Sequence, residues 1–361
     1  MKALVKPREY YAHDTLLEEN DKLFRKIWHF AGFLHDYVNE NDFTTLRLGS
    51  QPIVIQKLRG TIRAFHNVCS HRHSIIQTES KGNRPLMCPY HGWTYDNNGI
   101  PRGIPKKPLF KFTENELDCL KLKEYSLETC GQLIFVCLNE PEVSLNEFLG
   151  DHFQELALMS SNFDTKIDVN TMTINANWKI LVENTLESYH VNMVHTNTFK
   201  NLGAQGLDFE FKGLHSSWTA PLKLNENDKK LKRIHEPFKD RNYRIDGYKH
   251  ICVFPNTLIS STYGVSFNLS TIVPLSASET LFTSFVFLAR SKPEQDYNSL
   301  TNAYIESLIA FNRNVFDEDK EICEHVQKGV EASQYDGELS EEERRVCKFQ
   351  ENYKKYMYKE L

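Results

Sequence analysis

Two short loops, each offering a thiol and an imidazole, constrain this chain more than any other feature of its sequence. The first reads CSH at residues 69–71, and after sixteen residues the second reads CPYH at residues 88–91. The residues around them are rich in short β-type runs. Thiolate and imidazole ligands together suit iron and zinc. The sequence therefore predicts a metal centre held between two loops of a small β-rich region.

The order of the ligands favours a two-iron, two-sulfur cluster. In a Rieske centre, two cysteines bind one iron and two histidines bind the other, so each loop supplies one ligand of each kind. The candidate ligands are Cys69, His71, Cys88 and His91. Neutral imidazoles in place of two thiolates raise the reduction potential, so such a cluster accepts an electron readily. The alternative is a structural zinc site, although zinc fingers usually take both cysteines from one turn and both histidines from a helix.

Composition limits the other classes of protein to which the chain could belong. At 361 residues with 40% hydrophobic content, it is long enough for two or three domains. A net charge of −5 and a pI near 6.3 give no basic field, so neither nucleic acid nor an anionic membrane is an expected partner. The sequence shows no signal-peptide pattern and no apolar run long enough to span a membrane, which predicts a soluble, cytoplasmic protein.

In the first part of the chain, the spacing of apolar residues changes once from a helical pattern to a strand pattern. Residues 11–33 mix apolar and charged positions at helical spacing and predict a short helical segment. Short β-rich runs then follow at residues 43–48, 52–58 and 62–68, with a second set at 120–125 and 132–138. Ser144 and Glu147 form a capping-box pattern beyond these strands. We expect three parts: a helical segment over 1–40 packing on the catalytic domain, a cluster domain over 41–142 and a catalytic domain over 143–361.

The remaining residues predict an α+β domain. A helix is expected over residues 178–195, alternating strands over 248–289 and a long helix over 300–330. Apolar residues recur every three or four positions along the long helix, so one of its faces should pack on the sheet.

A second metal site is expected on the helix over 178–195. Open sites for oxygen chemistry on Fe(II) typically use two histidines and one carboxylate, and His190 and His195 supply the two histidines. Positions five apart on a regular helix differ by about 140°. Both side chains can therefore reach one metal only if the helix has a π-type bulge or a break. The alternative is a pair of ordinary helix histidines.

Three stretches carry a resemblance to a known family. CSHRHSIIQ and MCPYHGWTYDNNG resemble the Rieske signature of the ring-hydroxylating oxygenase large (alpha) subunits, although His73 stands where that family commonly has glycine. NWKILVENTLESYHVNMVH, ending at His195, is similar to the family's iron-binding segment. The resemblance implies an α+β protein with an N-terminal all-β Rieske domain. It also implies a C-terminal helix-grip domain, in which an antiparallel sheet packs with long helices.

The same resemblance implies roles for two acidic residues. VFDEDKEICEHVQKGV is similar to the segment that supplies the third ligand of the mononuclear Fe(II), and the match favours Asp319 over Asp317. Glu187 holds the position of an acid that, in the family, bridges a cluster histidine to an iron histidine of the neighbouring subunit. The resemblance therefore also implies a homotrimer, or a multiple of one.

The implied function is that of a terminal oxygenase using O₂ and electrons from NAD(P)H. No dinucleotide or plant-type ferredoxin motif is present, so a separate reductase, with or without a ferredoxin, is the expected partner. The substrate is expected to be a small quaternary amine or aromatic acid that is hydroxylated or demethylated. Trp218, Tyr263, Phe267 and Phe285 are candidates to line its pocket. The competing interpretations are a Rieske electron carrier and a zinc-stabilised binding module.

Overall fold

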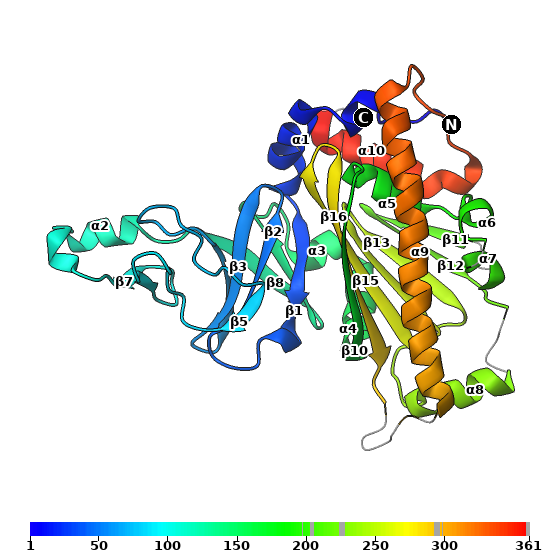
Figure 1. Ribbon diagram of the computed structural model, residues 1–361, viewed down its shortest axis with the longest axis horizontal. Coiled ribbons are helices and arrows are strands. Elements are labelled where there is room, and N and C mark those ends of the chain that lie inside the picture. The colour runs from blue at the N-terminus through cyan, green and yellow to red at the C-terminus, as the bar shows by residue number, and fades with distance from the viewer. Residues whose placement is uncertain (197, 203–205, 224–227, 292–296, 298, 359–361) are drawn as a thin grey trace. The chain divides into compact units, whose positions relative to one another are not determined.

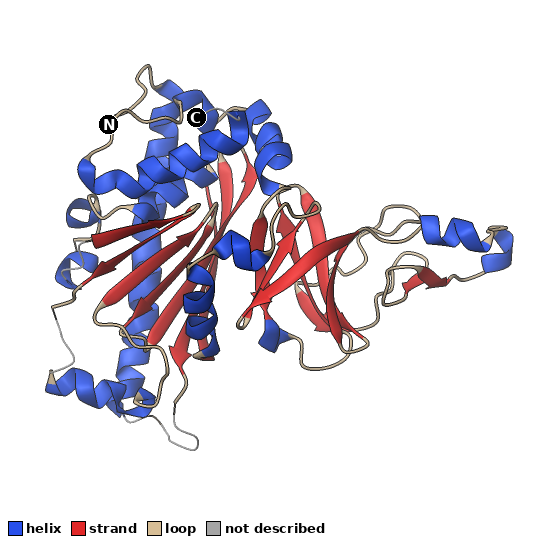
Figure 2. Ribbon diagram, turned by 180° about the vertical axis from the view of Figure 1, so that it is seen from behind, coloured by secondary structure: helices blue, strands red, loops and turns tan. Residues whose placement is uncertain are grey.

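The computed structural model describes residues 1–196, 198–202, 206–223, 228–291, 297 and 299–358. It divides into two compact units, Phe24–Phe148 and Met1–Leu23 with Leu149–Leu361. Each unit contains a large antiparallel sheet, and the second carries most of the helices (Figures 1 and 2). The predicted α+β class, with an all-β domain near the N-terminus, is confirmed. Within the described residues, no helix combines the length and apolar character needed to cross a bilayer.

Among the described residues, seven strands form the sheet of the Phe24–Phe148 unit, in the order β1-β9-β8-β4-β3-β2-β5. The bounds are β1 Trp28–Phe33, β2 Asp42–Leu48, β3 Gln51–Leu58, β4 Thr61–His66, β5 Lys81–Asn83, β8 Glu124–Cys130 and β9 Leu133–Cys137. A second, two-stranded sheet joins β6 Thr94–Tyr95 to β7 Pro101–Gly103. All these pairings are antiparallel, and the expected meander over residues 43–68 corresponds to β2, β3 and β4.

The helical segment predicted over residues 11–33 is wrong in its second half. Helix α1 covers His13–Glu19 and continues as a π-helical turn over Asn20–Phe24, after which Trp28–Phe33 forms strand β1. Five of the six residues of β1 are buried, and the strand pairs with β9. Aromatic side chains favour strands when both faces are covered. Burial on both faces therefore outweighed the helical spacing of the apolar residues.

Short helices complete this unit. They are α2 Glu114–Cys119 and α3 Leu145–Leu149, the second of which ends at the boundary between the units. The predicted capping box opens α3, since Glu147 accepts from the amide and hydroxyl of Ser144 at 2.9 and 2.7 Å. Strand β8 begins at Glu124, later than the predicted run over 120–125. None of the eight cysteines, all of which lie in the described residues, forms a disulfide.

The sheet of the other unit has seven described strands in the order β10-β16-β15-β14-β13-β12-β11. The bounds are β10 Phe163–Ile174, β11 Leu207–Lys212, β12 His215–Ala220, β13 Tyr248–Val253, β14 Thr257–Thr262, β15 Ser266–Ser276 and β16 Glu279–Ala289. Strands β13 to β16 occupy the predicted region 248–289 and pair antiparallel in sequence order. The sheet is therefore a meander extended by β10 on one edge and by β12 and β11 on the other.

Helices flank this sheet. They are α4 His152–Ser161, α5 Trp178–Leu186, α6 Val191–Val194, α7 Phe199–Leu202, α8 Lys229–His235, α9 Ser299–Ala332 and α10 Arg344–Tyr358. The long helix α9 matches the helix predicted over 300–330 and runs along one face of the sheet; it is in front of the strands in Figure 1 and behind them in Figure 2. One face of α9 therefore lies toward the strands, as in the ring contact between Phe316 of α9 and Phe282 of β16.

The helix predicted over residues 178–195 is interrupted. Asn177 caps α5 through a 3.0 Å bond from the Lys179 amide, but α5 ends at Leu186 because Glu187 has an extended backbone, with φ −128° and ψ 167°. A single turn, α6, follows. His190 and His195 are the residues on either side of that turn. The irregularity between the two histidines is therefore a complete break.

A buried acid fixes the start of α5. Glu19 accepts from Trp178 Nε1 at 2.8 Å, from Lys179 Nζ at 2.5 Å and from the Tyr353 hydroxyl at 2.7 Å. Glu19 and Lys179 are both fully buried. Removing one partner of such a pair leaves an uncompensated buried charge and costs about 3–5 kcal/mol. The network therefore joins the N-terminal helix, α5 and α10 into one rigid body.

Glu183, about one turn before the break, predicts a pH-dependent stability. Its carboxylate accepts from the Tyr10 hydroxyl at 2.9 Å and from Gln350 at 3.0 Å, and burial raises its pKa from 4.5 to about 7. Because the folded-state pKa is raised, the contribution to stability is complete below pH 4.5 and is lost as pH rises through 7. Replacing Glu183 by Gln should therefore raise the thermal unfolding midpoint more at pH 8 than at pH 5. Parallel pH profiles for the two proteins would contradict this assignment.

Candidate functional site

The two ligand-bearing loops of the Phe24–Phe148 unit have the same backbone structure. In the first, the Cys69 amide donates to Ser74 O at 2.8 Å and the His73 amide donates back to Cys69 O at 3.0 Å. In the second, the Cys88 amide donates to Trp93 O at 2.8 Å and the Gly92 amide donates to Cys88 O at 3.0 Å. Each cysteine therefore opens a turn that closes on itself five residues later.

His73 occupies the position that glycine fills in the second loop. Its φ is +59°, close to the +72° of Gly92. This left-handed region normally favours glycine because a Cβ crowds the following carbonyl, at a cost of about 1–2 kcal/mol. The His73 side chain is exposed. The departure from glycine therefore leaves the shape of the loop unchanged.

The four predicted ligands separate into an inner and an outer pair. Cys69 and Cys88 are buried and belong to the same apolar core as Trp93 and Tyr95. His71 and His91 lie further out, with ring centroids 4.7 Å apart, and His71 stacks on Trp93 at an interplanar angle of 4°. The Tyr95 hydroxyl donates to Cys69 Sγ at 3.0 Å. Burial raises the pKa of the Cys69 thiol and the bond from Tyr95 opposes that shift. The thiolate form therefore needs a nearby cation.

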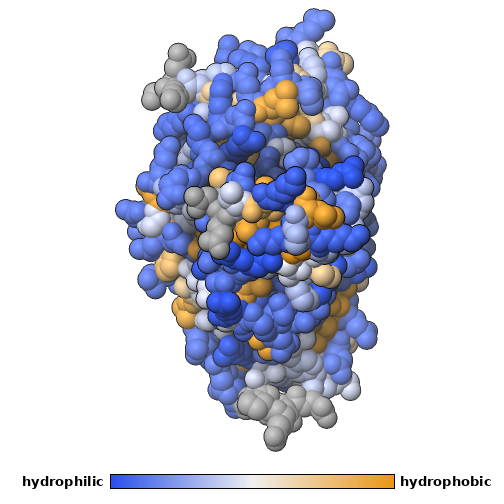
Figure 3. All heavy atoms as spheres, turned by 90° about the vertical axis from the view of Figure 1, so that its left-hand side faces the viewer, coloured by the Kyte–Doolittle hydropathy of each residue, from blue (hydrophilic) through white to orange (hydrophobic). Residues whose placement is uncertain are grey.

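The histidine side of this centre opens outward. A hollow is lined by His71, His91, Trp93, Pro105, Lys106, Leu109 and Phe110. Leu109 is 75% exposed and Tyr90 is 53% exposed. Figure 3 views the molecule from the end that carries α2 and β7, and apolar side chains gather near the middle of that view among hydrophilic ones. The outer imidazoles can therefore be approached by another molecule.

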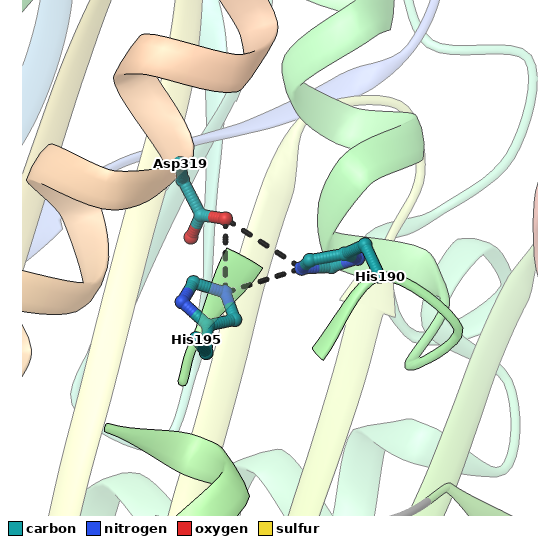
Figure 4. A group of neighbouring side chains, drawn as sticks. All are labelled: His190, His195 and Asp319. Atoms are coloured by element: carbon teal, nitrogen blue, oxygen red, sulfur yellow. Dashed lines mark hydrogen bonds and ion pairs between the residues drawn. The ribbon is translucent and has the colours of Figure 1, made fainter. Parts of the chain in front are cut away.

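The second predicted site brings together His190, His195 and Asp319. His190 and His195 flank α6, whereas Asp319 comes from α9, and the three side chains point toward one another (Figure 4). The two imidazole Nε2 atoms are 3.1 Å apart. Asp319 Oδ1 lies 3.1 Å from His195 Nε2 and 3.6 Å from His190 Nε2. Among the described residues, these three are the group whose ligand atoms converge closely enough to hold a metal ion.

Carboxylates behind the rings determine which nitrogen atoms are free. The Nδ1 of His190 donates to Glu187 through a short bond, and the Nδ1 of His195 donates to Glu318 at 2.7 Å. Each neutral ring therefore carries its proton on Nδ1 and presents a lone pair on Nε2. Carboxylates behind metal-bound histidines have this orienting role in many proteins.

The arrangement fits a divalent metal ion. Two imidazole lone pairs and a carboxylate oxygen repel one another unless a cation lies between them. With bonds of about 2.1 Å, adjacent ligands of an octahedral ion are separated by roughly 3.0 Å. Two of the observed separations, both 3.1 Å, agree with that value, and the third, between His190 and Asp319, is wider at 3.6 Å. Two histidines and one carboxylate on one side leave the other positions open, as Fe(II) oxygen chemistry requires.

The structure distinguishes the two aspartates of α9 and adds residues that the sequence analysis missed. Asp317 is exposed and outside the group. Asp319 accepts from Asn184 Nδ2 at 2.7 Å, which orients its carboxylate. Glu318 also accepts from the Thr198 hydroxyl at 2.7 Å. Glu318 and Asn184 are neighbours in sequence of residues already singled out. The packing of α5 against α9 gives Asn184 its contact, and the packing of the segment after α6 against α9 gives Glu318 its contacts.

Two adjoining cavities open from the triad. The inner one, of about 110 Å³, is lined by Glu187, His190, His195, Trp218, His250 and Asp319 among others. The outer one, of about 440 Å³, is mostly apolar. Both are lined by Phe199, Tyr248, Ser260, Asn268 and Asn312, so they are neighbours. A small organic molecule could therefore extend from the triad into the outer cavity.

Three of the four aromatic residues expected in the pocket line these cavities. Trp218 lines the inner one, and Tyr263 and Phe267 line the outer one. Phe285 lines neither. It pairs across the sheet with the exposed Val169 of β10, and the Lys166 ammonium lies 5.5 Å from its ring centroid. Phe285 therefore belongs to the other face of the sheet, because successive side chains of a strand alternate between faces.

Comparisons with solved structures agree with this fold. The quaternary ammonium Rieske monooxygenase CntA with bound L-carnitine superposes with a TM-score of 0.79 and 19% identity, over 99% of this chain and 95% of that one. Naphthalene 1,2-dioxygenase from Rhodococcus sp. superposes with a TM-score of 0.79 and 20% identity, over 99% of this chain and 94% of that one. At such identities the likeness establishes the architecture.

Sequence relatives are oxygenase subunits. The glycine betaine monooxygenase oxygenase subunit of Pseudomonas aeruginosa is 36% identical over 208 residues, which are 54% of this chain and 46% of that protein. The match thus spans just under half the length of that relative. The chloroplastic choline monooxygenase of Atriplex hortensis is 28% identical over 92% of this chain and 73% of its own length.

Family matches cover both units. Residues 28–120 match the Rieske [2Fe-2S] domain, and residues 160–359 match the ring hydroxylating alpha subunit (catalytic domain). The second match spans more than half of the chain and includes the residues of the triad. The chain therefore belongs to the ring-hydroxylating alpha-subunit family, the large subunits of Rieske non-haem iron oxygenases, whose cofactors are a Rieske [2Fe-2S] cluster and a mononuclear iron.

Proposed function

We propose that this protein is the terminal oxygenase of a multicomponent Rieske system. It would use O₂ and electrons from NAD(P)H, delivered by a separate reductase with or without a ferredoxin, to hydroxylate or demethylate a small organic substrate. The observation that carries the proposal is the convergence of His190, His195 and Asp319 beside a cavity that opens into a larger apolar one.

Each predicted ligand has a role in this proposal. Cys69, His71, Cys88 and His91 hold the [2Fe-2S] cluster, and His190, His195 and Asp319 hold the Fe(II). When bound, the cluster supplies single electrons and the mononuclear iron supplies oxygen chemistry. Glu187 and Glu318 keep both imidazoles in the tautomer that presents Nε2, while Asn184 orients the Asp319 carboxylate. The protein thus contributes positioning and electrostatics.

Glu187 has a second proposed role, between subunits. Its carboxylate accepts a hydrogen bond from the His190 ring and another, of 3.1 Å, from the His190 backbone amide. Its side chain is only 11% exposed in the single chain. We assign to Glu187 the link between the iron histidine and a cluster histidine of a neighbouring subunit in a homotrimer, or a multiple of one. A solved structure of a quaternary ammonium Rieske monooxygenase with this fold gives insight into inter-subunit electron transfer in that enzyme, which supports the arrangement.

The outer cavity bears on the substrate class. Phe199, Tyr248, Tyr263, Phe267, Tyr304 and Phe311 line it, together with several hydroxyl and amide side chains. Within the described part of the chain, its lining includes no acidic residue and one lysine, Lys223. Aromatic faces can hold either a flat ring or a quaternary ammonium group. We therefore propose a small aromatic acid or quaternary amine, the two classes named among the relatives.

Replacing His190 by Ala tests the proposed iron site. The variant should keep the cluster spectrum, lose the mononuclear iron and form no product, because two ligands alone hold Fe(II) poorly. Metal and sulfide analysis, paramagnetic resonance of the reduced protein and product formation with an added reductase measure these three quantities. Met193→Ala is the matched control, since Met193 lies on the same helical turn and is 81% exposed.

The alternatives give different results in the same experiment. A Rieske electron carrier would pass electrons to its acceptor equally well with and without His190. A zinc-stabilised module would contain zinc and no sulfide in the unmodified protein. Either result would contradict the proposed oxygenase function.

Tyr95→Phe tests the proposed cluster ligation. The hydroxyl donates to Cys69 Sγ, and this bond should strengthen when the cluster is reduced, because reduction adds negative charge. If the bond is stronger by about 1 kcal/mol in the reduced state, its loss should lower the reduction potential by roughly 40 mV for a one-electron couple. Voltammetry of the purified protein measures this. Tyr125→Phe is the control, because Tyr125 is buried in a separate core of the same unit; equal shifts in both variants would contradict the assignment.

Glu187→Gln and Glu318→Gln separate the inter-subunit role from ordinary orientation of a ligand. Both changes weaken a carboxylate behind an iron histidine, which should lower iron affinity about 10–100-fold. When both variants are saturated with iron, Glu187→Gln should still turn over at least tenfold more slowly than Glu318→Gln. Product formation at saturating iron measures the difference. Equal rates would show that Glu187 only orients His190.

A further inference from the structure

Arg345 is a buried cation with no acid beside it. The side chain, on α10, is 0% exposed. Its guanidinium donates to Ser216 Oγ at 3.0 Å, to Ser216 O at 3.1 Å and to Leu186 O at 3.5 Å. Burial lowers its pKa to about 10, so it remains charged at neutral pH. Among the described residues, no carboxylate lies within ion-pair distance of it, although buried charges are normally paired.

The remaining contact of Arg345 determines the protonation of His250. Arg345 Nη2 lies 3.1 Å from His250 Nδ1. A guanidinium can only donate, so His250 Nδ1 must accept and its ring proton must be on Nε2. Burial, and then the charge of Arg345, lower the pKa of His250 well below its ordinary value. His250 is therefore a neutral imidazole with an Nε2–H donor.

The side chain that carries this donor lines the cavity beside the triad. His250, on β13, is 7% exposed and lines the inner cavity with His190, His195 and Asp319. It pairs with Trp218 on one neighbouring strand and with Ser260 on the other, and both also line the cavity. In the part of the chain that the structure describes, the only hydrogen bond of its ring is the one from Arg345. A donor at a cavity wall with no hydrogen-bond partner among the described residues is suited to a ligand oxygen.

The charges around this donor favour an anionic oxygen. The positive charge of Arg345 lies directly behind the ring and polarises the Nε2–H bond toward the cavity. The inner cavity has two acids among the residues that line it. Glu187 accepts a hydrogen bond from His190, and Asp319 faces His195 within the triad. The remaining polar side chains of the inner lining, including Ser260, Asn268 and Asn312, are neutral. Hydrogen bonds to charged acceptors are roughly twice as strong as neutral ones.

We propose that His250, backed by Arg345, binds a carboxylate of the substrate and thereby positions the carbon that reacts at the metal. This assignment rests on the proposed oxygenase function and narrows its substrates to small organic acids, whether they carry an aromatic ring or a quaternary ammonium group. His250 is then the specificity-determining residue of the inner cavity, and Arg345 acts through it as a positioning residue.

Binding of matched probes tests the assignment without turnover. Titration calorimetry on protein containing both metal centres would compare glycine betaine with tetramethylammonium, and benzoate with benzyl alcohol. The acid of at least one pair should bind about tenfold or more tightly than its neutral or cationic counterpart. His250→Phe should erase that preference and leave the weaker probe unchanged. His250→Gln, which can keep a donor near the position of Nε2, should restore most of it.

Each outcome decides the inference. It is overturned if neither acid binds preferentially to the unmodified protein, or if His250→Phe keeps the preference while metal content and cluster absorption are intact. Arg345→Met should act in the same direction; since that change can unfold the protein, the His250 pair carries the test. For any acid that is turned over, His250→Phe should raise KM more than it lowers kcat. Acid-selective binding without any O₂-dependent product would refute the oxygenase function and leave this anion site in place.

Discussion

The candidate iron site depends on paired carboxylates and imidazoles. Glu187 and Glu318 accept hydrogen bonds from the Nδ1–H groups of His190 and His195, which leaves two Nε2 lone pairs facing Asp319. Without those acids, each ring could rotate or carry its proton on the wrong nitrogen, and the three ligand atoms would not converge. The local backbone serves this geometry, because the chain leaves the helical conformation at Glu187 and resumes it for one turn between the histidines.

The antiparallel sheet and α9 supply the rest of the site. Helix α9 carries Glu318 and Asp319 to the break after α5, while β12 and β13 place Trp218 and His250 on the cavity wall. Buried polar groups far from the metal hold these elements together, including Glu19 with Lys179 and Arg345 with Ser216. Substrate-facing and metal-facing side chains are therefore fixed to the same rigid framework, which is the condition for placing a carbon atom reproducibly.

The sequence predicted correctly those helices and strands whose apolar residues recur most regularly. The strands β2 to β4 and β13 to β16, the capping box before α3 and the long helix α9 lie where alternation, turn residues and helical spacing indicated. The failures are also physical. Helical spacing of the apolar residues predicts a helix where strand β1 forms. No Gly or Pro marks the end of α5 at Glu187, so the break there was indicated only by the need for both histidines to reach one metal.

The sequence by itself determined the candidate ligands: Cys69, His71, Cys88 and His91 in that order, the histidine pair at 190 and 195, and an acid in the segment around Asp319. The first two sets follow from residue type and spacing within short stretches, and the acid follows from the resemblance of its segment to a known family. Only the tertiary structure decided that Asp317 is exposed, that Asn184 and Glu318 orient the ligands, and that Arg345 stands behind His250. The physical reason is that hydrogen bonding and burial between segments distant in the chain depend on packing, which no local pattern encodes.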